Sequence, residues 1–252
     1  MITKISAFVI TKNEEQKIVS CLTHLSFADE IVVLDSGSTD ATVSLTKKFT
    51  KKIFTQKFEG YGPQKQAAID KCSNDWILEV DADEIVTPEL ALEIKQLLSS
   101  PQKLEQHAAY TLVRQEFFLG KPLMRSSILR LYRKDSVHYT ELLHEKLIVQ
   151  GSIGKLRHMI LHESDKYETI ANRITKINLY TKKEAEIICG QNPSLLLTLF
   201  NMFTLPFIYF SWQYFFQWLI FKGYRGLIWS LLTAYYHFLI HAKVYEYIYK
   251  QK

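Results

Sequence analysis

The sequence predicts an α/β fold: a mostly parallel, Rossmann-like sheet flanked by helices, followed by a helical C-terminal segment. Two observations predict the sheet. Short apolar runs alternate with helix-like segments over residues 1–103, and polar clusters follow directly after several of those runs. A third observation predicts the C-terminal segment: aromatic residues make up 13% of the chain and are concentrated in its last quarter, where charged residues are scarce.

The alternation starts with an apolar strand at residues 5–10 and a helix at 13–25 whose apolar residues recur on one side. Further strands are expected at 30–34, 52–54 and 76–80, and further helices at 41–49, 64–71 and 88–98. Gly62 and Pro63 are expected to break the chain before the helix at 64–71. Strands that are apolar on both faces and joined by helices are typical of a parallel sheet covered on both sides.

The pattern changes after residue 108. Short apolar runs at 110–113, 128–132 and 146–149 predict added strands, partly antiparallel, and a polar helix is expected at 167–188. We therefore divide the chain into three parts: residues 1–103, residues 104–165 as an extension of the same sheet, and the helical residues 166–252.

The C-terminal part is unusual in its charge pattern, because residues 187–221 and 226–242 contain no Asp, Glu, Lys or Arg. Apolar stretches of this length raise the question of a membrane. Two full spans would place Lys222 and Arg225 on the outer side, against the positive-inside tendency. We therefore expect helices that lie in, or dip into, the inner leaflet. The alternative is a buried helical hairpin or a dimer interface, so a homo-oligomer stays open.

The overall composition excludes several classes of protein. Hydrophobic residues make up 47% of the chain, which excludes disorder. The net charge of +5 is too mild to indicate nucleic-acid binding. The three cysteines form no CxxC pair, which favours a reducing compartment. Because no signal peptide opens the chain, we expect the N-terminus to stay in the cytoplasm.

Polar side chains follow three of the predicted strands. Asp81 and Asp83 come after 76–80, and two carboxylates this close in a loop can face one Mg²⁺ or Mn²⁺ ion, which a nucleoside diphosphate can also ligate. Asp35 follows 30–34 and can accept from a base N–H or a ribose hydroxyl. Thr11 and Asn13 follow 5–10. Because parallel sheets bind ligands outside the carboxyl ends of their strands, these clusters predict one shared site.

Three motifs carry a resemblance to a known family. The segments FVITKNE (8–14), IVVLDSGSTD (31–40) and WILEVDADE (76–84) resemble glycosyltransferase family 2 domains, which are inverting enzymes of GT-A fold. Segments at 120–122, 129–133, 144–147, 161–162 and 176–181 resemble the subgroup that acts on the lipopolysaccharide inner core. This subgroup includes β-glucosyltransferases that modify core heptose.

The resemblance implies a role for each candidate residue of a nucleotide-sugar site in residues 1–103. Four residues would hold the uridine of a UDP-sugar and a lysine would lie near the nucleotide: Thr11, Asn13, Glu14, Asp35 and Lys65. Asp81 would face the ribose or the metal, and Asp83 would bind the metal through the diphosphate. His162 would complete the metal site or contact the diphosphate, although a structural role fits a lone histidine at a strand end equally well.

The acceptor side would lie in residues 104–165. A carboxylate must take the proton of the acceptor hydroxyl, and the resemblance favours Glu145, with Asp135 and Glu141 as rivals. Such a base contributes roughly 10²- to 10⁴-fold to the rate. Arg130 would clamp the donor diphosphate or a phosphorylated core sugar.

Together these inferences predict an inverting glycosyltransferase that depends on Mn²⁺ or Mg²⁺. It would transfer a hexose, glucose in first place, from a UDP-sugar to a lipid-linked saccharide at the cytoplasmic face of the inner membrane. The expected acceptor is inner-core heptose. A capsule, exopolysaccharide or undecaprenyl-linked acceptor is the alternative, and a non-catalytic nucleotide-sugar-binding membrane scaffold is a remote one. A Rossmann dehydrogenase is disfavoured, because no GxGxxG follows the first strand.

Overall fold

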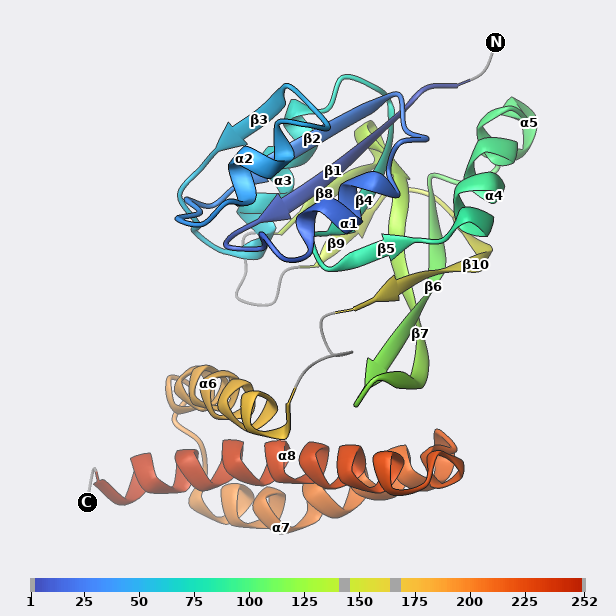
Figure 1. The fold of residues 1–252 in the computed structure, drawn as a ribbon. Helices are drawn as coiled ribbons and strands as arrows, with labels where there is room; N and C mark the ends of the chain where they lie inside the picture. Colours follow the sequence, from blue (N-terminus) through green and yellow to red (C-terminus); the bar gives the residue numbers. More distant parts are fainter. Residues whose placement is uncertain (1–2, 141–145, 164–168, 251–252) are drawn as a thin grey trace. The chain divides into compact units, whose positions relative to one another are not determined.

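The computed structural model describes residues 3–140, 146–163 and 169–250 (Figure 1). The chain forms two compact units, which are described separately. The first comprises Met1–Glu116 and Arg125–Ser164, and the second comprises Phe117–Met124 and Asp165–Lys252.

The first unit is built on a mixed sheet of eight strands in the order β3-β2-β1-β4-β7-β6-β10-β5. Its parallel half contains β1 (Ile5–Thr11), β2 (Glu30–Asp35), β3 (Lys52–Thr55) and β4 (Trp76–Asp81). The other half contains β5 (Glu84–Val86), β6 (Ala109–Phe118), β7 (Lys121–Arg133) and β10 (Ile153–His162). A separate antiparallel pair consists of β8 (Val137–Tyr139) and β9 (Leu147–Val149).

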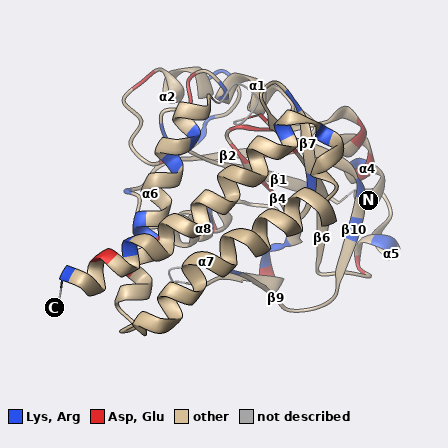
Figure 2. Ribbon diagram, turned by 90° about the horizontal axis from the view of Figure 1, so that it is seen from below, with Lys and Arg blue, Asp and Glu red and all other residues tan. Residues whose placement is uncertain are grey.

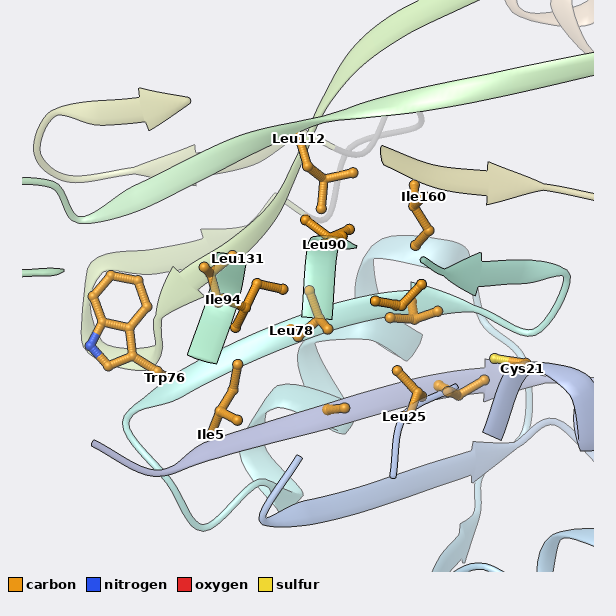
Figure 3. Packing of buried hydrophobic residues seen from close by; sticks show 14 of the residues in the cluster. Ile5, Cys21, Leu25, Trp76, Leu78, Leu90, Ile94, Leu112, Leu131 and Ile160 are labelled. Atoms are coloured by element: carbon orange, nitrogen blue, oxygen red, sulfur yellow. The ribbon is translucent and has the colours of Figure 1, made fainter. Parts of the chain in front are cut away.

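Helices cover both faces of this sheet, as the sequence predicted. They are α1 (Ile18–Thr23), α2 (Thr42–Thr46), α3 (Tyr61–Lys71), α4 (Pro88–Leu98) and α5 (Pro101–Leu104), with a 3₁₀ turn η1 (Lys134–Ser136) after β7. Successive residues of β1 contribute to different cores, because side chains alternate across a strand. Ala7 and Val9 join a core with Leu90 and Ile94 of α4, whereas Phe8 joins a core with Ile69 of α3 (Figure 3 shows the first core).

Helices α1 and α3 begin at other residues than predicted. Helix α1 is confined to Ile18–Thr23, because Asn13 adopts a positive φ of 55° and the residues after it form turns. Helix α3 begins at Tyr61, so the prediction that Gly62 and Pro63 precede the helix was wrong. Proline is tolerated in a first helical turn, where its missing N–H would have no intrahelical partner.

The long β6–β7 hairpin turns over two residues, Leu119 and Gly120, which both have positive φ. This conformation is typical of the two-residue turns that match the twist of antiparallel strands. The tip of the hairpin groups with the C-terminal helices, whereas the sequence division placed it with the middle part of the chain.

The second unit contains α6 (Ile170–Cys189), α7 (Leu195–Ser211) and α8 (Tyr224–Lys250), with short turns η2 (Trp212–Phe216) and η3 (Leu219–Lys222) between α7 and α8. Phe118 and Leu123 of the hairpin tip form a small core with Leu219 and Trp229. A Cβ atom on Gly226 would lie 1.9 Å from the carbonyl oxygen of Leu219, so the close approach of α8 to η3 requires glycine there.

Helix α7 leaves most of its apolar surface exposed. Figure 2 shows no Lys, Arg, Asp or Glu along it. Among the described residues, Leu195–Phe216 is the one helical stretch long and apolar enough to cross a membrane, judged by length and composition alone. The predicted helical, apolar C-terminal segment is therefore confirmed as a fold element.

Candidate active site

A cavity of about 670 Å³ lies at the carboxyl ends of the parallel strands. Strand register explains why distant residues meet there: Thr11 is the Cα partner of Asp35, and Ile10 is the Cα partner of Asp81. The predicted shared edge is therefore confirmed. The side chains that give the cavity its chemistry come from β1, α3, the ends of β2, β4 and β10, and the loops beside them: Thr11, Lys12, Glu14, Ser36, Phe58, Tyr61, Lys65, Asp81, Asp83 and His162.

Two residues predicted to hold uridine organise the loop after β2. The carboxylate of Asp35 is buried and accepts from the backbone N–H groups of Gly37 (2.9 Å) and Ser38 (2.8 Å) and from the Ser38 hydroxyl. The side-chain oxygen of Asn13 accepts from the backbone N–H of Thr39 at 2.8 Å. Both side chains therefore shape the wall of the site, and neither is among the residues that line the cavity.

The hydroxyl of Thr11 is a better candidate for ligand contact. Thr11 lines the cavity and is 5% exposed, yet its Oγ1 has no hydrogen-bond partner among the described residues. A buried hydroxyl without a partner is costly, so a ligand that pairs with it gains affinity. Glu14 also lines the cavity, where its carboxylate lies 3.1 Å from the ammonium of Lys17.

Arg130 is the centre of a buried charge cluster. Its guanidinium contacts the carboxylates of Glu79 and Asp81 and lies 2.9 Å from that of Glu84. Burial alone would raise the pKa of Asp81, but Arg130 and Lys65 outweigh this effect and hold that pKa at about 2. The guanidinium of Arg130 is thus paired with carboxylates, and Arg130 is not among the residues that line the cavity. This differs from the predicted contact with the donor.

Glu79 was missed by the sequence-based prediction. It lies within the apolar run of β4 and is 1% exposed, and its carboxylate accepts from Lys65 (2.6 Å), Tyr132 (2.8 Å) and Tyr139 (2.6 Å). The available signal was a lone acidic residue inside an otherwise buried strand, because a buried carboxylate requires partners. Through Lys65, Glu79 connects the buried cluster to the cavity.

Asp83 and His162 lie together at the cavity. His162 Nε2 is 3.4 Å from Asp83 Oδ2, and the backbone N–H of Glu163 donates to the carbonyl of Asp83 at 2.9 Å. Burial opposes a charge on the imidazole, but the carboxylates of Asp83 and Glu116, which accept hydrogen bonds from the ring, prevail and raise the pKa of His162 to about 10. The two carboxylates beside the ring make this part of the cavity negative, and opposite charges attract at short range.

These residues fit a divalent cation as a pair of ligands. Two ligands at about 2.0–2.2 Å from one ion and at right angles lie roughly 3 Å apart, close to the observed separation. No group of three or more His, Cys, Asp or Glu side chains among the described residues is arranged to hold a metal ion. The remaining ligands would have to come from water or from substrate phosphates, as Mg²⁺ sites commonly arrange.

The structure therefore brings together six of the predicted residues at one cavity: Thr11, Glu14, Lys65, Asp81, Asp83 and His162. Of the three carboxylates considered as the base, the structure describes Asp135 alone. Glu145 and Glu141 lie outside the described residues. Asp135 is exposed on η1, where it pairs with Arg133 at 2.5 Å.

Comparisons with known proteins identify the family of the chain. The family model "Glycosyl transferase family 2" matches residues 6–140. A lipopolysaccharide core biosynthesis glycosyltransferase, LpsC of Rhizobium meliloti, is 30% identical over 257 residues, which cover 96% of this chain and 92% of LpsC. An uncharacterised glycosyltransferase of Rickettsia felis is 30% identical, covering 99% of this chain and 92% of its own length.

Solved structures show only a distant likeness. The crystal structure of S. aureus TarS matches with a TM-score of 0.46 and 17% identity, covering 72% of this chain and 40% of TarS. The sequence matches, in contrast, span most of the chain. On their strength, together with the family model, the chain belongs to glycosyl transferase family 2 and is a glycosyltransferase.

Proposed function

We propose that this glycosyltransferase transfers a hexose, glucose in first place, from a UDP-sugar to the heptose of a lipopolysaccharide inner core, with inversion and with the help of Mn²⁺ or Mg²⁺. The observation that carries the proposal is the single cavity at the carboxyl ends of β1 and β4. It combines a buried hydroxyl with no hydrogen-bond partner in the described part of the chain, a lysine and an Asp–His pair: Thr11, Lys65, Asp83 and His162.

The donor would bind with its nucleoside between the ends of β1 and β2. Thr11 Oγ1 supplies an unused hydrogen-bonding group there. Phe58 and Tyr61 form an edge-to-face pair with ring centroids 5.0 Å apart, and both line the same cavity. The ammonium of Lys65, 3.9 Å from Asp81 Oδ1, would stand beside the ribose and diphosphate.

The diphosphate would bind on the side of Asp83 and His162, which would hold the divalent cation. When bound, the cation neutralises charge on the leaving diphosphate. Asp81 is committed to Arg130 and Lys65, so its contribution to a cation would be secondary to that of Asp83.

The transfer itself is a direct displacement. The acceptor hydroxyl oxygen forms a bond to the anomeric carbon, the bond from that carbon to the phosphate oxygen breaks, and the UDP leaves with the electron pair. A carboxylate takes the hydroxyl proton, and Glu145 remains the proposed base. Attack on the face opposite the departing phosphate inverts the anomeric centre.

The proposed acceptor rests on the relative whose name states a pathway. LpsC is named as a lipopolysaccharide core biosynthesis enzyme, and the match covers nearly all of both chains. This coverage includes the C-terminal helices, which the family model does not reach. A lipid-linked acceptor also accounts for an exposed apolar surface on the same chain.

We propose further that α7 lies in the cytoplasmic face of the inner membrane. Four apolar residues one turn apart form a stripe along it, with exposed fractions between 63% and 79%: Leu196, Phe200, Phe203 and Phe207. The opposite side of α7 contacts α8. Exposed stripes of this size are rare on soluble monomers, and the flanking Lys182, Lys222 and Lys243 suit an anionic surface.

Flotation with vesicles of phosphatidylethanolamine and phosphatidylglycerol tests the membrane proposal. Burying one phenylalanine side chain contributes about 1.5–3 kcal/mol. The double variant Phe203→Asp, Phe207→Asp should therefore bind on the order of 10²- to 10⁴-fold more weakly. Leu92→Asp is the matched control, because Leu92 is 57% exposed on α4 in the first unit. Unchanged flotation of the double variant would refute the proposal.

Thermal unfolding in the presence of nucleotides tests the donor. A ligand that binds only the folded chain stabilises it by ~2.7 kcal/mol at a hundredfold excess over its dissociation constant. UDP with Mn²⁺ should raise Tm more than UDP alone, and more than GDP or CMP with Mn²⁺. No response to any nucleotide would refute donor binding. Transfer from UDP-glucose to heptose-terminated core, and not to undecaprenyl phosphate sugars, would then establish the acceptor.

A further inference from the structure

Glu116 is a buried acidic residue beside the cavity that the proposed function does not use. It lies on β6, which runs parallel to β10, and the register makes Glu116 the Cα partner of His162. The residue is 7% exposed, and its Oε2 lies 2.7 Å from His162 Nδ1. Two strands that are distant in the sequence thus bring the Glu116 carboxylate to Nδ1 of His162, whereas Nε2 of the same ring faces Asp83 at the cavity.

The carboxylate of Glu116 is itself held in place. Arg114, two residues earlier on the same strand, donates from Nε to Glu116 Oε1 at 2.5 Å. The other nitrogen of His162, Nε2, lies 3.4 Å from Asp83 Oδ2. Arg114, Glu116, His162 and Asp83 therefore form a continuous chain of contacts that ends at the cavity.

We propose that Glu116 is a positioning residue for His162. By accepting from Nδ1–H, Glu116 fixes the orientation of the imidazole ring and directs Nε2 to the position beside Asp83. A histidine that ligates a metal through one nitrogen commonly donates from the other to a carboxylate, which sets the ring orientation and raises the basicity of the ligand. The inference rests on the proposed cation site. It states that Glu116 increases the affinity of that site for the cation.

A second pair on the same strand shows that the contact alone does not define such a role. His158, also on β10, pairs through Nδ1 with Glu93 Oε2 at 2.9 Å. The His158 side chain is 48% exposed, and neither residue lines the cavity. Glu93 and His158 therefore provide a matched control with the same chemistry away from the site.

The experiment measures Mn²⁺ binding by the full chain saturated with UDP, from the electron paramagnetic resonance signal of free Mn²⁺. Three variants are compared with the wild type: Glu116→Ala, Glu116→Gln and the control Glu93→Gln. Glutamine keeps an oxygen that can accept from Nδ1, so it should rescue part of the affinity. We expect Glu116→Ala to weaken Mn²⁺ binding on the order of 10- to 100-fold, Glu116→Gln to weaken it less, and Glu93→Gln to leave it unchanged.

A merely structural role would lower the Tm of the Glu116 variants but leave Mn²⁺ binding by the folded protein intact. Under the proposed role, the affinity of the variants for UDP without metal should stay within twofold of that of the wild type. Mn²⁺ affinity within twofold of the wild type in the folded Glu116 variants overturns the inference alone. Equal weakening by Glu93→Gln also overturns it. Absence of Mn²⁺ binding in the wild type overturns the cation site of the proposed function and this inference together. If Glu116→Ala does not fold, Glu116→Gln decides.

Discussion

Removal of the guanidinium at the centre of the buried cluster should destabilise the first unit strongly. In Arg130→Met the carboxylates of Glu79, Asp81 and Glu84 would lose their common partner. Water would not replace it, because Arg130 is only 5% exposed. Breaking a buried ion pair by removing one partner costs about 3–5 kcal/mol, because the remaining charge is left without compensation. For a unit of this size each kcal/mol shifts Tm by roughly 2–4 °C. We therefore expect Tm to fall by about 6–20 °C.

Arg133→Met is the matched control for this prediction. Arg133 is three residues further along the same strand and pairs with Asp135, but both side chains are largely exposed, at 41% and 66%. Exposed ion pairs contribute about 0–1 kcal/mol. The two variants remove the same group from the same strand, so the difference between their Tm values measures the effect of burial on the ion pairs.

The stability of the wild type and that of Arg130→Met should change with pH in opposite directions. In the wild type Arg130 helps hold the pKa of Asp81 at about 2, so that contribution to stability is complete at neutral pH and is lost as pH falls toward 2. In Arg130→Met only Lys65 and Arg114 still oppose the effect of burial on these carboxylates, so burial should raise carboxylate pKa values above their unfolded values. The folded variant then binds more protons than the unfolded chain, so its free energy of unfolding should increase as the pH falls from 7.5 to 5.5. Urea unfolding followed by circular dichroism measures both. A cost below about 1 kcal/mol at pH 7.5, or a difference that widens at pH 5.5, would refute the reasoning.

Three further predictions concern single groups. Asp83→Asn should abolish the Mn²⁺-dependent part of the Tm increase by UDP and keep the increase by UDP alone; an unchanged Mn²⁺ effect would contradict the cation site. Thr11→Val replaces a hydroxyl without a described partner, so the free chain should keep its Tm while UDP affinity, measured by calorimetry, falls about fivefold to tenfold; equal affinity would exclude Thr11 from the donor site. Glu30→Gln should lower stability by about 1 kcal/mol at pH 7, because Glu30 accepts from Lys52 and the backbone N–H of Ser73 and its pKa is held at about 2 despite partial burial. The difference from the wild type should shrink as pH falls from 4.5 toward 2, and a constant urea midpoint difference over that range would argue against an ionised Glu30.

The parallel half of the sheet could be predicted from the sequence because its signals are local. Continuous apolar runs identify β1, β2 and β4, and the rule that parallel strands share one carboxyl edge brings Thr11, Asp35 and Asp81 to neighbouring ends. The helix boundaries were less accurate. Pro63 ends a helical pattern in most contexts but is also accepted in a first turn, and the sequence does not distinguish the two.

The direction of each polar side chain could not be predicted in the same way. Asp35 and Asn13 stand at strand ends where a ligand or a neighbouring backbone N–H is an equally good partner, and in the structure both accept from the loop after β2. Arg130 and Glu79 are 51 residues apart, and their pairing depends on which strands are neighbours in the sheet. The antiparallel contact of β7 with β4 decides it, and no periodicity in the sequence specifies that contact.

The two aspartates at and just after the end of β4 have different partners, and this difference can be tested. Strand β4 ends at Asp81 and β5 begins at Glu84, so the turn between them directs Asp81 to Arg130 and Asp83 to His162. Residues in one contact network show non-additive effects on stability, whereas separate ones add within about 0.5 kcal/mol. Asp81→Asn combined with Arg130→Met should therefore cost less than the sum of the single variants, because the partner of each charge is already gone. Asp83→Asn combined with Arg130→Met should be additive; additivity in both double variants would mean that the loop does not separate the two carboxylates.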